Sequence, residues 1–526
     1  MKAHRVPLGD GKAVQVIDLP GTFPLVLPVC RGVKLMQIVD EICPMNSGDH
    51  LTHGQVCEFV LLLLLHADKR GPLYKMDQWA AEHNVNEIYG FEPEAFNDDR
   101  IGRTLDALSE HIFEIQTAVV TRALAAYHID PRIIHWDLTS VVCADARRRS
   151  ELVQSGYGGG LIHERQVQLS LQITSEAALP ILHHTLPGNV QQPLLVAQML
   201  AAVQQVAGRS DVVIVSDRKG ICYDSIQTYR RNGAHFVGPL NLHDHASVAR
   251  QLAAAPPEAF TPLSYRSMNR PERSQSHYQT TVSLKPLNRR EPVLVQALFI
   301  DSPSLREDAQ NTRRKQADQA VQRLQEISGY LNRRRYASAE YAVEQLRKAV
   351  APNLGGIVSY ELSGEDGALR LTYELDENAL AAASVAEGDG RYVLVYDLPG
   401  DPEPDEVFGL HREQISIEQR FRTLNTDLDI HPLWLHKDNR IAALILLFML
   451  SLLVYGLLEH LSVQAGLRTP RYHKMTTREL IQRFCGTRLI RIEARGQPMQ
   501  DQLVIPEEQQ EILDQLGLPD AKHYLH

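Results

Sequence analysis

The sequence lacks the features that mark several large classes of protein. Its six cysteines are scattered with no CxxC pair, so we expect neither a disulfide framework nor a zinc ribbon, and a cytoplasmic location fits best. The N-terminal MKAHRVPLGDGKAVQV has no apolar signal-peptide core. A net charge of −10 excludes a histone-like protein that coats DNA. Ordinary contents of hydrophobic (44%) and charged (22%) residues exclude global disorder.

Long hydrophobic runs are also scarce, with one exception. Residues 441–458 (IAALILLFMLSLLVYGLL) carry no charge over 18 positions, the lower limit for a membrane-spanning helix. The run stands alone, and neither flank has a clear excess of Lys or Arg. These features favour a helix buried in a large α/β domain and predict no membrane partner. A membrane anchor is the alternative, which sedimentation with membranes would reveal.

Five segments differ in their sequence pattern. The 526 residues are enough for about three domains, or for one core with a large insertion. The first segment is acidic and predicts a mainly helical accessory, DNA-binding or dimerisation domain, whereas strands and helices alternate from Arg132 onward. A charged helical pair over 303–350 with flanking strands predicts an inserted α+β domain, and eight Lys/Arg against two Glu mark a basic stretch from Arg468 to Arg495. The predicted boundaries are 1–125, 126–239, 240–400, 401–465 and 466–526.

Two aspartates lie in or directly after strong strand patterns. Asp137 stands inside the β-branched run IIHWDLTSVVC, where a buried carboxylate is costly unless it is paired or binds a metal. Asp217 follows the apolar strand DVVIVS, and ligands of open α/β sheets bind at the carboxyl ends of strands. A turn or helix-cap role is the plain alternative for each residue.

A third element is the segment 411–428 (HREQISIEQRFRTLNTDL), which predicts one helix with an apolar stripe. A polar row runs beside the stripe at steps of three or four residues, through His411, Gln414, Glu418, Arg422 and Asn425. Such a helix suits the inner edge of an active site. The alternative is a solvated face with a Glu418–Arg422 ion pair.

Two strand aspartates and one helix glutamate suit two-metal chemistry on phosphodiesters. Mg²⁺, or Mn²⁺ in its place, prefers hard carboxylate oxygens, and a pair of ions activates the attacking oxygen and stabilises the leaving one. Histidine is not required for such a site. The pairs His183-His184 and His243-Asp244-His245 have no further ligand at a suitable spacing, so we expect them to be structural or surface residues.

The order of these motifs resembles that of DDE transposases of bacterial insertion sequences. The motifs are "HWDLTSV", "VIVSDRKGI" and "ISIEQRFRTL" followed by a very apolar helix. The gaps of 80 and 201 residues between the three carboxylates resemble the subgroup with a β-rich insertion before the glutamate. The N-terminal "LTHGQVCEFVLLLLL", "GPLYKMDQWA" and "NDDRIGRTLDAL" resemble the helical N-terminal domain of one branch of that subgroup.

This resemblance implies an α/β fold with an RNase H-like catalytic core, a large α+β insertion and a mainly helical N-terminal domain. It implies that Asp137, Asp217 and Glu418 are the catalytic and metal-binding triad of a Mg²⁺-dependent transposase. The partners would be double-stranded DNA, namely terminal inverted repeats and target DNA, and a second copy of the chain on the DNA.

The sequence departs from the subgroup around the glutamate. The subgroup has Tyr, Arg, Glu and Lys where this chain has His411, Gln414, Glu418 and Asn425. Because both cationic members are replaced, the alternative is a catalytically impaired, transposase-derived DNA-binding protein. Arg412, Arg420 or Arg422 offers a substitute grip on phosphate. The residues expected to contact DNA are His411, Arg412, Gln414, Arg422, Asn425, Arg471 and Lys474.

Overall fold

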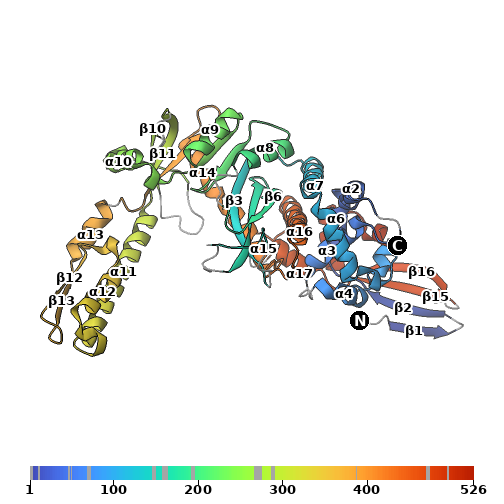
Figure 1. The fold of residues 1–526 in the computed structure, drawn as a ribbon. Coiled ribbons are helices and arrows are strands. Elements are labelled where there is room, and N and C mark those ends of the chain that lie inside the picture. The colour runs from blue at the N-terminus through green and yellow to red at the C-terminus, as the bar shows by residue number, and fades with distance from the viewer. Residues whose placement is uncertain are drawn as a thin grey trace. The chain divides into compact units, whose positions relative to one another are not determined.

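The chain folds as two compact units in the computed structural model (Figure 1). Unit 1 comprises Met1–Phe236 and His411–His526, and unit 2 comprises Val237–Leu410. The structure describes residues 4–9, 12–45, 48, 50–67, 73–144, 150–156, 164–190, 196–265, 275–285, 291–386, 388–469, 474–494 and 497–526. Unit 2 therefore interrupts unit 1 over the range in which the sequence predicts an insertion.

A mixed β-sheet lies in unit 1. Its strands are β3 (Ile133–Val142), β4 (Gln154–Ser155), β5 (Arg165–Thr174), β6 (Pro180–Pro187) and β7 (Val213–Ser216). Strand β3 pairs with β5 in antiparallel fashion and with β7 in parallel fashion. The short apolar β7 is buried at all four positions, as expected for a parallel strand that is covered on both faces.

Helices cover this sheet on two sides. Trp136 of β3 faces α8 (Val196–Ala207) and α9 (Tyr223–Arg231), where it shares a small apolar space with Met199 and Tyr229. The preceding and following residues, His135 and Asp137, point to the opposite face because side chains alternate along a strand. Helix α15 (Ile415–Thr426) contacts β3 and β5. Gln414, the residue directly before α15, forms a hydrogen bond with His135 of β3.

The described N-terminal part of unit 1 is built from seven α-helices. Two of them begin at capping side chains: Thr52 and Gln55 form a capping box before one helix, and the side chain of Asn97 accepts from the backbone N–H of Arg100 at the start of another. The helices are α1 (Phe23–Gly32), α2 (Leu35–Ile42), α3 (His53–Leu64), α4 (Met76–Glu82), α5 (Asn86–Tyr89), α6 (Asp98–Ser109) and α7 (Ile112–Ala126).

The most apolar helix of the chain lies inside unit 1. Helix α16 (Asp438–Gln464) contacts α3, α6, α7 and β6. By length and composition it is the one helix among the described residues that is able to cross a membrane, yet 94% of its most apolar 18-residue window is buried in the fold. This burial agrees with the predicted core helix and explains why residues 1–125 are not separate from the sheet: they form much of the cover of α16.

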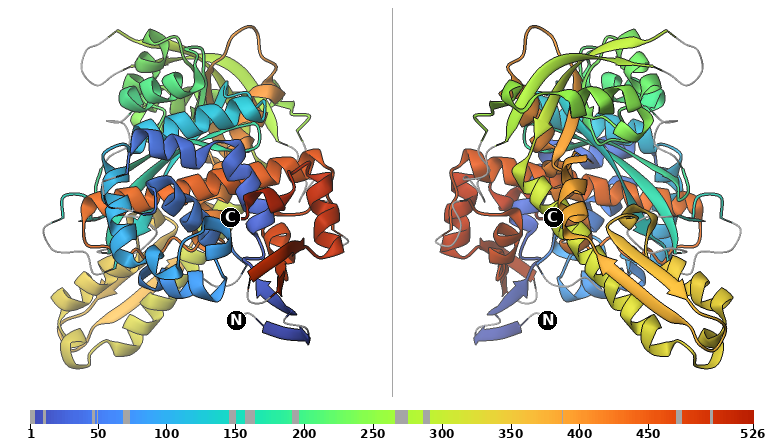
Figure 2. Two further views of the ribbon diagram at one scale, coloured as in Figure 1. Left: turned by 90° about the vertical axis from the view of Figure 1, so that its right-hand side faces the viewer. Right: turned by 90° about the vertical axis from the view of Figure 1, so that its left-hand side faces the viewer.

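The basic C-terminal stretch is a folded part of unit 1. It contains α17 (Thr477–Arg483), β15 (Arg488–Ala494), β16 (Gln497–Val504) and α18 (Glu507–Gln515). These strands form a sheet in the order β1-β2-β15-β16 with the N-terminal β1 (His4–Gly9) and β2 (Lys12–Asp18). The blue and red strands accordingly lie together in both views of Figure 2. The two ends of the sequence thus share one sheet, which a local sequence pattern does not reveal.

Unit 2 contains a sheet and a helical module. The sheet runs β8-β14-β11-β10-β9, and α10 (Ala246–Ala254) contacts β10 and β14. The strands are β8 (His235–Pro239), β9 (Thr261–Pro262), β10 (Ser276–Leu284), β11 (Val293–Asp301) and β14 (Arg391–Asp397).

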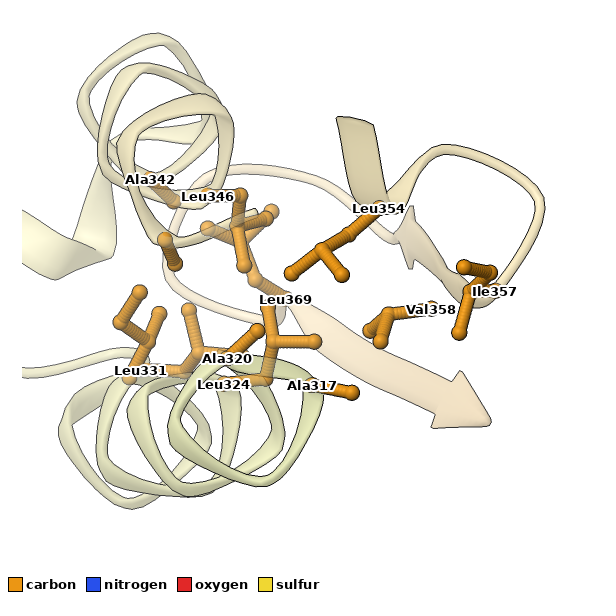
Figure 3. Packing of buried hydrophobic residues seen from close by; sticks show 12 residues of the cluster. Ala317, Ala320, Leu324, Leu331, Ala342, Leu346, Leu354, Ile357, Val358 and Leu369 are labelled. Carbon is orange, nitrogen blue, oxygen red and sulfur yellow. The ribbon is translucent and has the colours of Figure 1, made fainter. Parts of the chain in front are cut away.

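The helical module has its own apolar core (Figure 3). Ala317 and Leu324 of α11 (Pro303–Tyr330) pack with Leu346 of α12 (Ala339–Ala349). Antiparallel β12 (Val358–Ser363) and β13 (Arg370–Leu375) add Val358 and flanking residues, and α13 (Glu377–Ala386) follows. The charged helical pair that the sequence predicts over 303–350 is confirmed.

Candidate active site

Asp137 and Asp217 occupy neighbouring positions at the sheet. Trp136 of β3 pairs with Ser216 of β7 in the parallel register, and each aspartate is the next residue along the chain, Asp137 within β3 and Asp217 directly after β7. Adjacent strands lie about 4.8 Å apart, so the sheet brings these two carboxylates together although 80 residues separate them in the sequence.

The carboxylate of Asp217 organises the turn after β7. Its Oδ1 accepts from the backbone N–H groups of Lys219 at 2.9 Å and Gly220 at 3.2 Å. Helix α9 begins only at Tyr223, with Cys222 at its N-cap. Asp217 is therefore a turn residue and not the cap of that helix, and no protein hydrogen bond is described for its second oxygen.

Asp137 is in an environment that disfavours its ionised form. Burial, the neighbouring Asp217 and, to a smaller extent, Glu418 raise the pKa of Asp137 to about 7. A hydrogen bond from the backbone N–H of Leu138 at 2.7 Å and the charge of Lys219 act in the opposite direction. Asp217 and Glu418 are thus close enough to Asp137 to repel its ionised form, and a bound cation would reduce this repulsion.

The donor chemistry of this set suits a divalent cation, although its side chains do not converge. Among the described residues, no three His, Cys, Asp or Glu side chains are near enough to hold one ion. Asp137 and Asp217 are half-buried, whereas Glu418, in the first turn of α15, is exposed.

Gln414 connects the glutamate helix to the aspartate strand. Its Oε1 lies 3.0 Å from Nδ1 of buried His135, and its Nε2 donates to the backbone carbonyl of Trp136 at 3.0 Å. The predicted single helix over 411–428 is wrong at this point: α14 (Pro404–Glu413) ends at Glu413 and α15 begins at Ile415. Both polar atoms of the Gln414 side chain are used inside the protein, and this geometry gives no support to the predicted DNA contact.

His411 lies beside the same junction and carries no charge at neutral pH. Burial, with the charges of Arg412 and Arg218 and the nearby His135, lowers the pKa of His411 to about 4. A neutral, largely enclosed imidazole does not replace a cation for phosphate binding. The imidazole instead lies near His135 of β3.

Three of the predicted DNA contacts are exposed on α14 and α15. Arg412, Arg422 and Asn425 are exposed, and within the described part of the chain their side chains make no hydrogen bond or ion pair. The alternative Glu418–Arg422 ion pair is thus not formed. By contrast, Arg420 is buried and holds Glu459 at 2.8 Å and the carbonyls of Ala177 and Ala178.

The cations of the C-terminal stretch are mostly paired within unit 1. The Nζ of Lys474 lies 3.0 Å from Glu459, and Arg491 binds both Glu87 at 2.7 Å and Asp501 at 2.9 Å. Arg478, Arg483 and Arg488 pair with Asp427, Glu508 and Asp18. Arg471 lies outside the described residues. The local excess of positive charge is therefore largely matched by acids from other segments, which weakens the expectation of a DNA-binding tail.

Two contributors to the site were missed in the sequence. Lys219 affects Asp137 electrostatically, and His135 anchors the glutamate helix. The signal for His135 was available, because residues 135 and 137 lie on one face of a strand. The partner of His135 was not predictable, since Gln414 is 279 positions away.

Comparisons with known proteins give distant similarities. A model described as a domain of unknown function (DUF4277) matches residues 14–119, and no curated protein matches. A piggyBac transposase in a synaptic complex with hairpin DNA is 8% identical with a TM-score of 0.38, covering 92% of this chain and 82% of that one. A pre-cleavage Mos1 transpososome and a Mos1 paired-end complex are each 12% identical, with TM-scores of 0.15 and 0.16.

The Mos1 matches cover 36% and 42% of this chain and 61% and 78% of theirs. The matched structures are thus transposases, two of the three named as complexes with transposon or hairpin DNA.

Proposed function

We propose that the protein is a metal-dependent DNA transposase that cleaves element ends and joins them to target DNA. The observation that carries the proposal is the position of Asp137 beside Asp217 and near Glu418, which together with burial raise the pKa of Asp137 to about 7. Raised carboxylate pKa values concentrate at functional sites because clustered like charges are costly elsewhere.

Asp137, Asp217 and Glu418 would hold Mg²⁺ or Mn²⁺, which supplies Lewis-acid stabilisation of phosphodiester oxygens when bound. Asp217 is oriented by the backbone N–H groups of residues 219 and 220, and Gln414 fixes the start of the helix that carries Glu418. Lys219 and the exposed Arg412 and Arg422 provide positive charge for the DNA backbone beside these carboxylates. The chain thus contributes mainly positioning and electrostatics, which phosphoryl transfer requires.

The resemblance in motif order supports double-stranded DNA as the partner, with terminal inverted repeats and target DNA as substrates. It also supports a homodimer on DNA and a cytoplasmic, nucleoid-associated protein. Inverted repeats that bracket the gene would identify the substrate ends.

The decisive experiment is cleavage of DNA that carries these ends, with the full chain in Mg²⁺ or Mn²⁺. We expect Asp137→Asn and Glu418→Gln each to reduce cleavage at least 100-fold while DNA binding in EDTA is retained. The matched control is Glu365→Gln, an exposed carboxylate in unit 2. Undiminished cleavage by either site variant rejects the triad.

The second candidate function is a DNA-binding protein derived from a transposase. It is favoured by the internal hydrogen bonds of Gln414 and the neutral state of His411, which stand where the resembling proteins have cationic and tyrosine side chains. DNA binding without cleavage in either metal, across the range of pH 6 to 9, would establish this alternative.

A further inference from the structure

The turn between α11 and α12 presents three consecutive arginines that have no partner. Arg333, Arg334 and Arg335 are all exposed, and no hydrogen bond or ion pair of their guanidinium groups exists among the described residues. Two other cations of the same module are neutralised: Arg313 is buried against Asp389 at 2.6 Å, and Lys348 pairs with Glu344 at 2.6 Å. The turn thus places three unpaired guanidinium groups on consecutive residues, whereas the exposed Lys315, Arg323 and Arg347 stand singly along the helices.

Aromatic rings accompany the arginines. Tyr330 stacks on Tyr336, with ring centroids 5.8 Å apart and an interplanar angle of 28°. Tyr336 in turn contacts Tyr341 edge-on at 5.1 Å. Tyr330 remains 57% exposed, so the stack ends in an open ring. We call residues 330–336 with Tyr341 the arginine–tyrosine tip.

The backbone of the tip is held in place by local bonds. The side chain of Asn332 donates to the carbonyl of Leu369 at 2.9 Å and accepts from the N–H of the same residue at 2.7 Å. The N–H groups of Asn332 and Tyr336 bond to the carbonyls of Tyr336 and Arg333. Leu331 belongs to the core of the module (Figure 3). The arginines and the open ring are thus presented on a fixed support.

One arginine occupies a backbone conformation that its side chain does not favour. Arg334 has φ of 48°, where a residue with a Cβ is less stable than glycine by about 1 kcal/mol. Strained positions of this kind cluster at functional sites because the surrounding structure must maintain them. Stability alone would select Gly or Asn at this turn.

We propose that the arginine–tyrosine tip is a DNA-binding site separate from the candidate active site. The arginines bind backbone phosphates, and the open face of Tyr330 stacks on a base that is unpaired, as in a single-stranded extension or a distorted duplex. Guanidinium groups and exposed aromatic rings on one support are the elements that recognise single-stranded nucleic acid. The choice of DNA rests on the proposed function, whereas the site rests on the geometry of the tip.

The test measures DNA binding by the full-length protein in EDTA, so that cleavage plays no part. Two probes are used, a blunt duplex and the same duplex with a single-stranded extension. Arg333→Gln, Arg334→Gln and Arg335→Gln are combined in one variant. Its matched control combines Lys315→Gln, Arg323→Gln and Arg347→Gln, which remove three exposed charges from the helices of the same module.

We expect the tip variant to lose at least tenfold in affinity for the extended probe, with a smaller slope of log affinity against log salt. The control variant should lose less than threefold. Tyr330→Ala should lower the affinity for the extended probe about tenfold and leave the affinity for the blunt duplex unchanged, because only unpaired bases offer a face for stacking.

Arg334→Gly separates function from folding. Glycine relieves the backbone strain and removes one charge, so this variant should melt at the same or a higher temperature and bind the extended probe more weakly. Equal affinities of the tip and control variants would overturn the proposal. DNA binding through the tip without cleavage would refute catalysis and leave the tip assignment intact, whereas a native chain that binds neither probe refutes both.

Discussion

The Gln414 side chain spans two segments of the fold, with its Oε1 at 3.0 Å from Nδ1 of His135 and its Nε2 at 3.0 Å from the carbonyl oxygen of Trp136. His135 is buried and stands two residues before Asp137. Gln414 stands four residues before Glu418. One amide therefore fixes the strand of one candidate ligand against the helix of another.

Replacing this amide should loosen the connection. Gln414→Leu removes the hydrogen-bond partner of His135 Nδ1 and a donor to the carbonyl of Trp136, which costs about 1–3 kcal/mol for each buried group that stays unpaired. We expect the free energy of unfolding in urea to fall by about 2 kcal/mol and cleavage to fall with it. Gln419→Leu, an exposed position on α15, is the control. Equal unfolding midpoints of the two variants would mean that the bonds to β3 contribute nothing.

The raised pKa of Asp137 predicts a pH-dependent stability. Its folded-state pKa of about 7 exceeds the usual value of 3.8, so between pH 4 and 7 the folded chain keeps a proton that the unfolded chain has released. Stability therefore falls as pH rises through this window. Because the side chain is part-exposed, the loss should be on the order of 1–2 kcal/mol.

Thermal melts in EDTA at pH 5 and pH 8 check this prediction. Asp137→Asn should lack this part of the pH dependence, and Mg²⁺ should raise the melting temperature of the native chain at pH 8 but not that of the variant. Parallel pH profiles of native chain and variant would contradict it.

Arg491 provides a test of the C-terminal ion pairs. Its side chain is 21% exposed between Glu87 and Asp501, so Arg491→Met leaves two carboxylates unpaired and should cost about 1–3 kcal/mol. The exposed pair of Arg483 and Glu508 should contribute less than about 1 kcal/mol, as Arg483→Gln would show in the same urea titration. A larger loss for Arg483→Gln than for Arg491→Met would reverse this ranking.

The exposed Arg412 and Arg422 of α14 and α15 should affect DNA binding and not stability, unlike Arg491. Replacing Arg412 and Arg422 with glutamine removes no described contact and should leave the melting temperature unchanged. DNA affinity should decrease, and the salt slope should fall by about 2 if each side chain neutralises one phosphate. Filter binding at several salt concentrations measures this slope. An unchanged slope would exclude both residues from the DNA interface.

The elements whose signal is local were predictable. The strand around Asp137, the buried strand before Asp217, the charged helices over 303–350 and the core helix around 441–458 are all present in the structure. Hydrophobic periodicity and length are sufficient for such elements, because each residue's environment repeats along the element itself.

Ion pairs and side-chain hydrogen bonds between residues far apart in the sequence were not predictable. The basic stretch 468–495 looks like a DNA-binding tail until its arginines are seen beside Asp18, Glu87 and Glu508. The polar row through His411, Gln414 and Glu418 looks continuous because helical spacing does not reveal that Gln414 bonds to β3. Charge pairing and side-chain hydrogen bonds across hundreds of residues leave no periodic trace in the sequence.

His183 of β6 has a buried imidazole that makes its stability contribution dependent on pH. Both ring nitrogens of His183 lack hydrogen bonds within the described part of the chain, and the residue is only 2% exposed. Burial, with the adjacent His184, lowers the pKa of His183 to about 3. As pH falls below 6.5, the unfolded chain binds a proton that the folded chain refuses, so stability falls toward acid.

At pH 5 this difference should cost about 2 kcal/mol relative to pH 7.5. His183→Leu removes the titrating group. The loss of unfolding free energy between pH 7.5 and pH 5 should therefore be about 2 kcal/mol smaller in this variant than in the native chain. Packing changes at the site cancel in the comparison because they contribute equally at both pH values. His243→Gln, at a 95% exposed side chain, should retain the native pH dependence. If His183→Leu also retains it, the imidazole is protonated in the folded chain as readily as in the unfolded one.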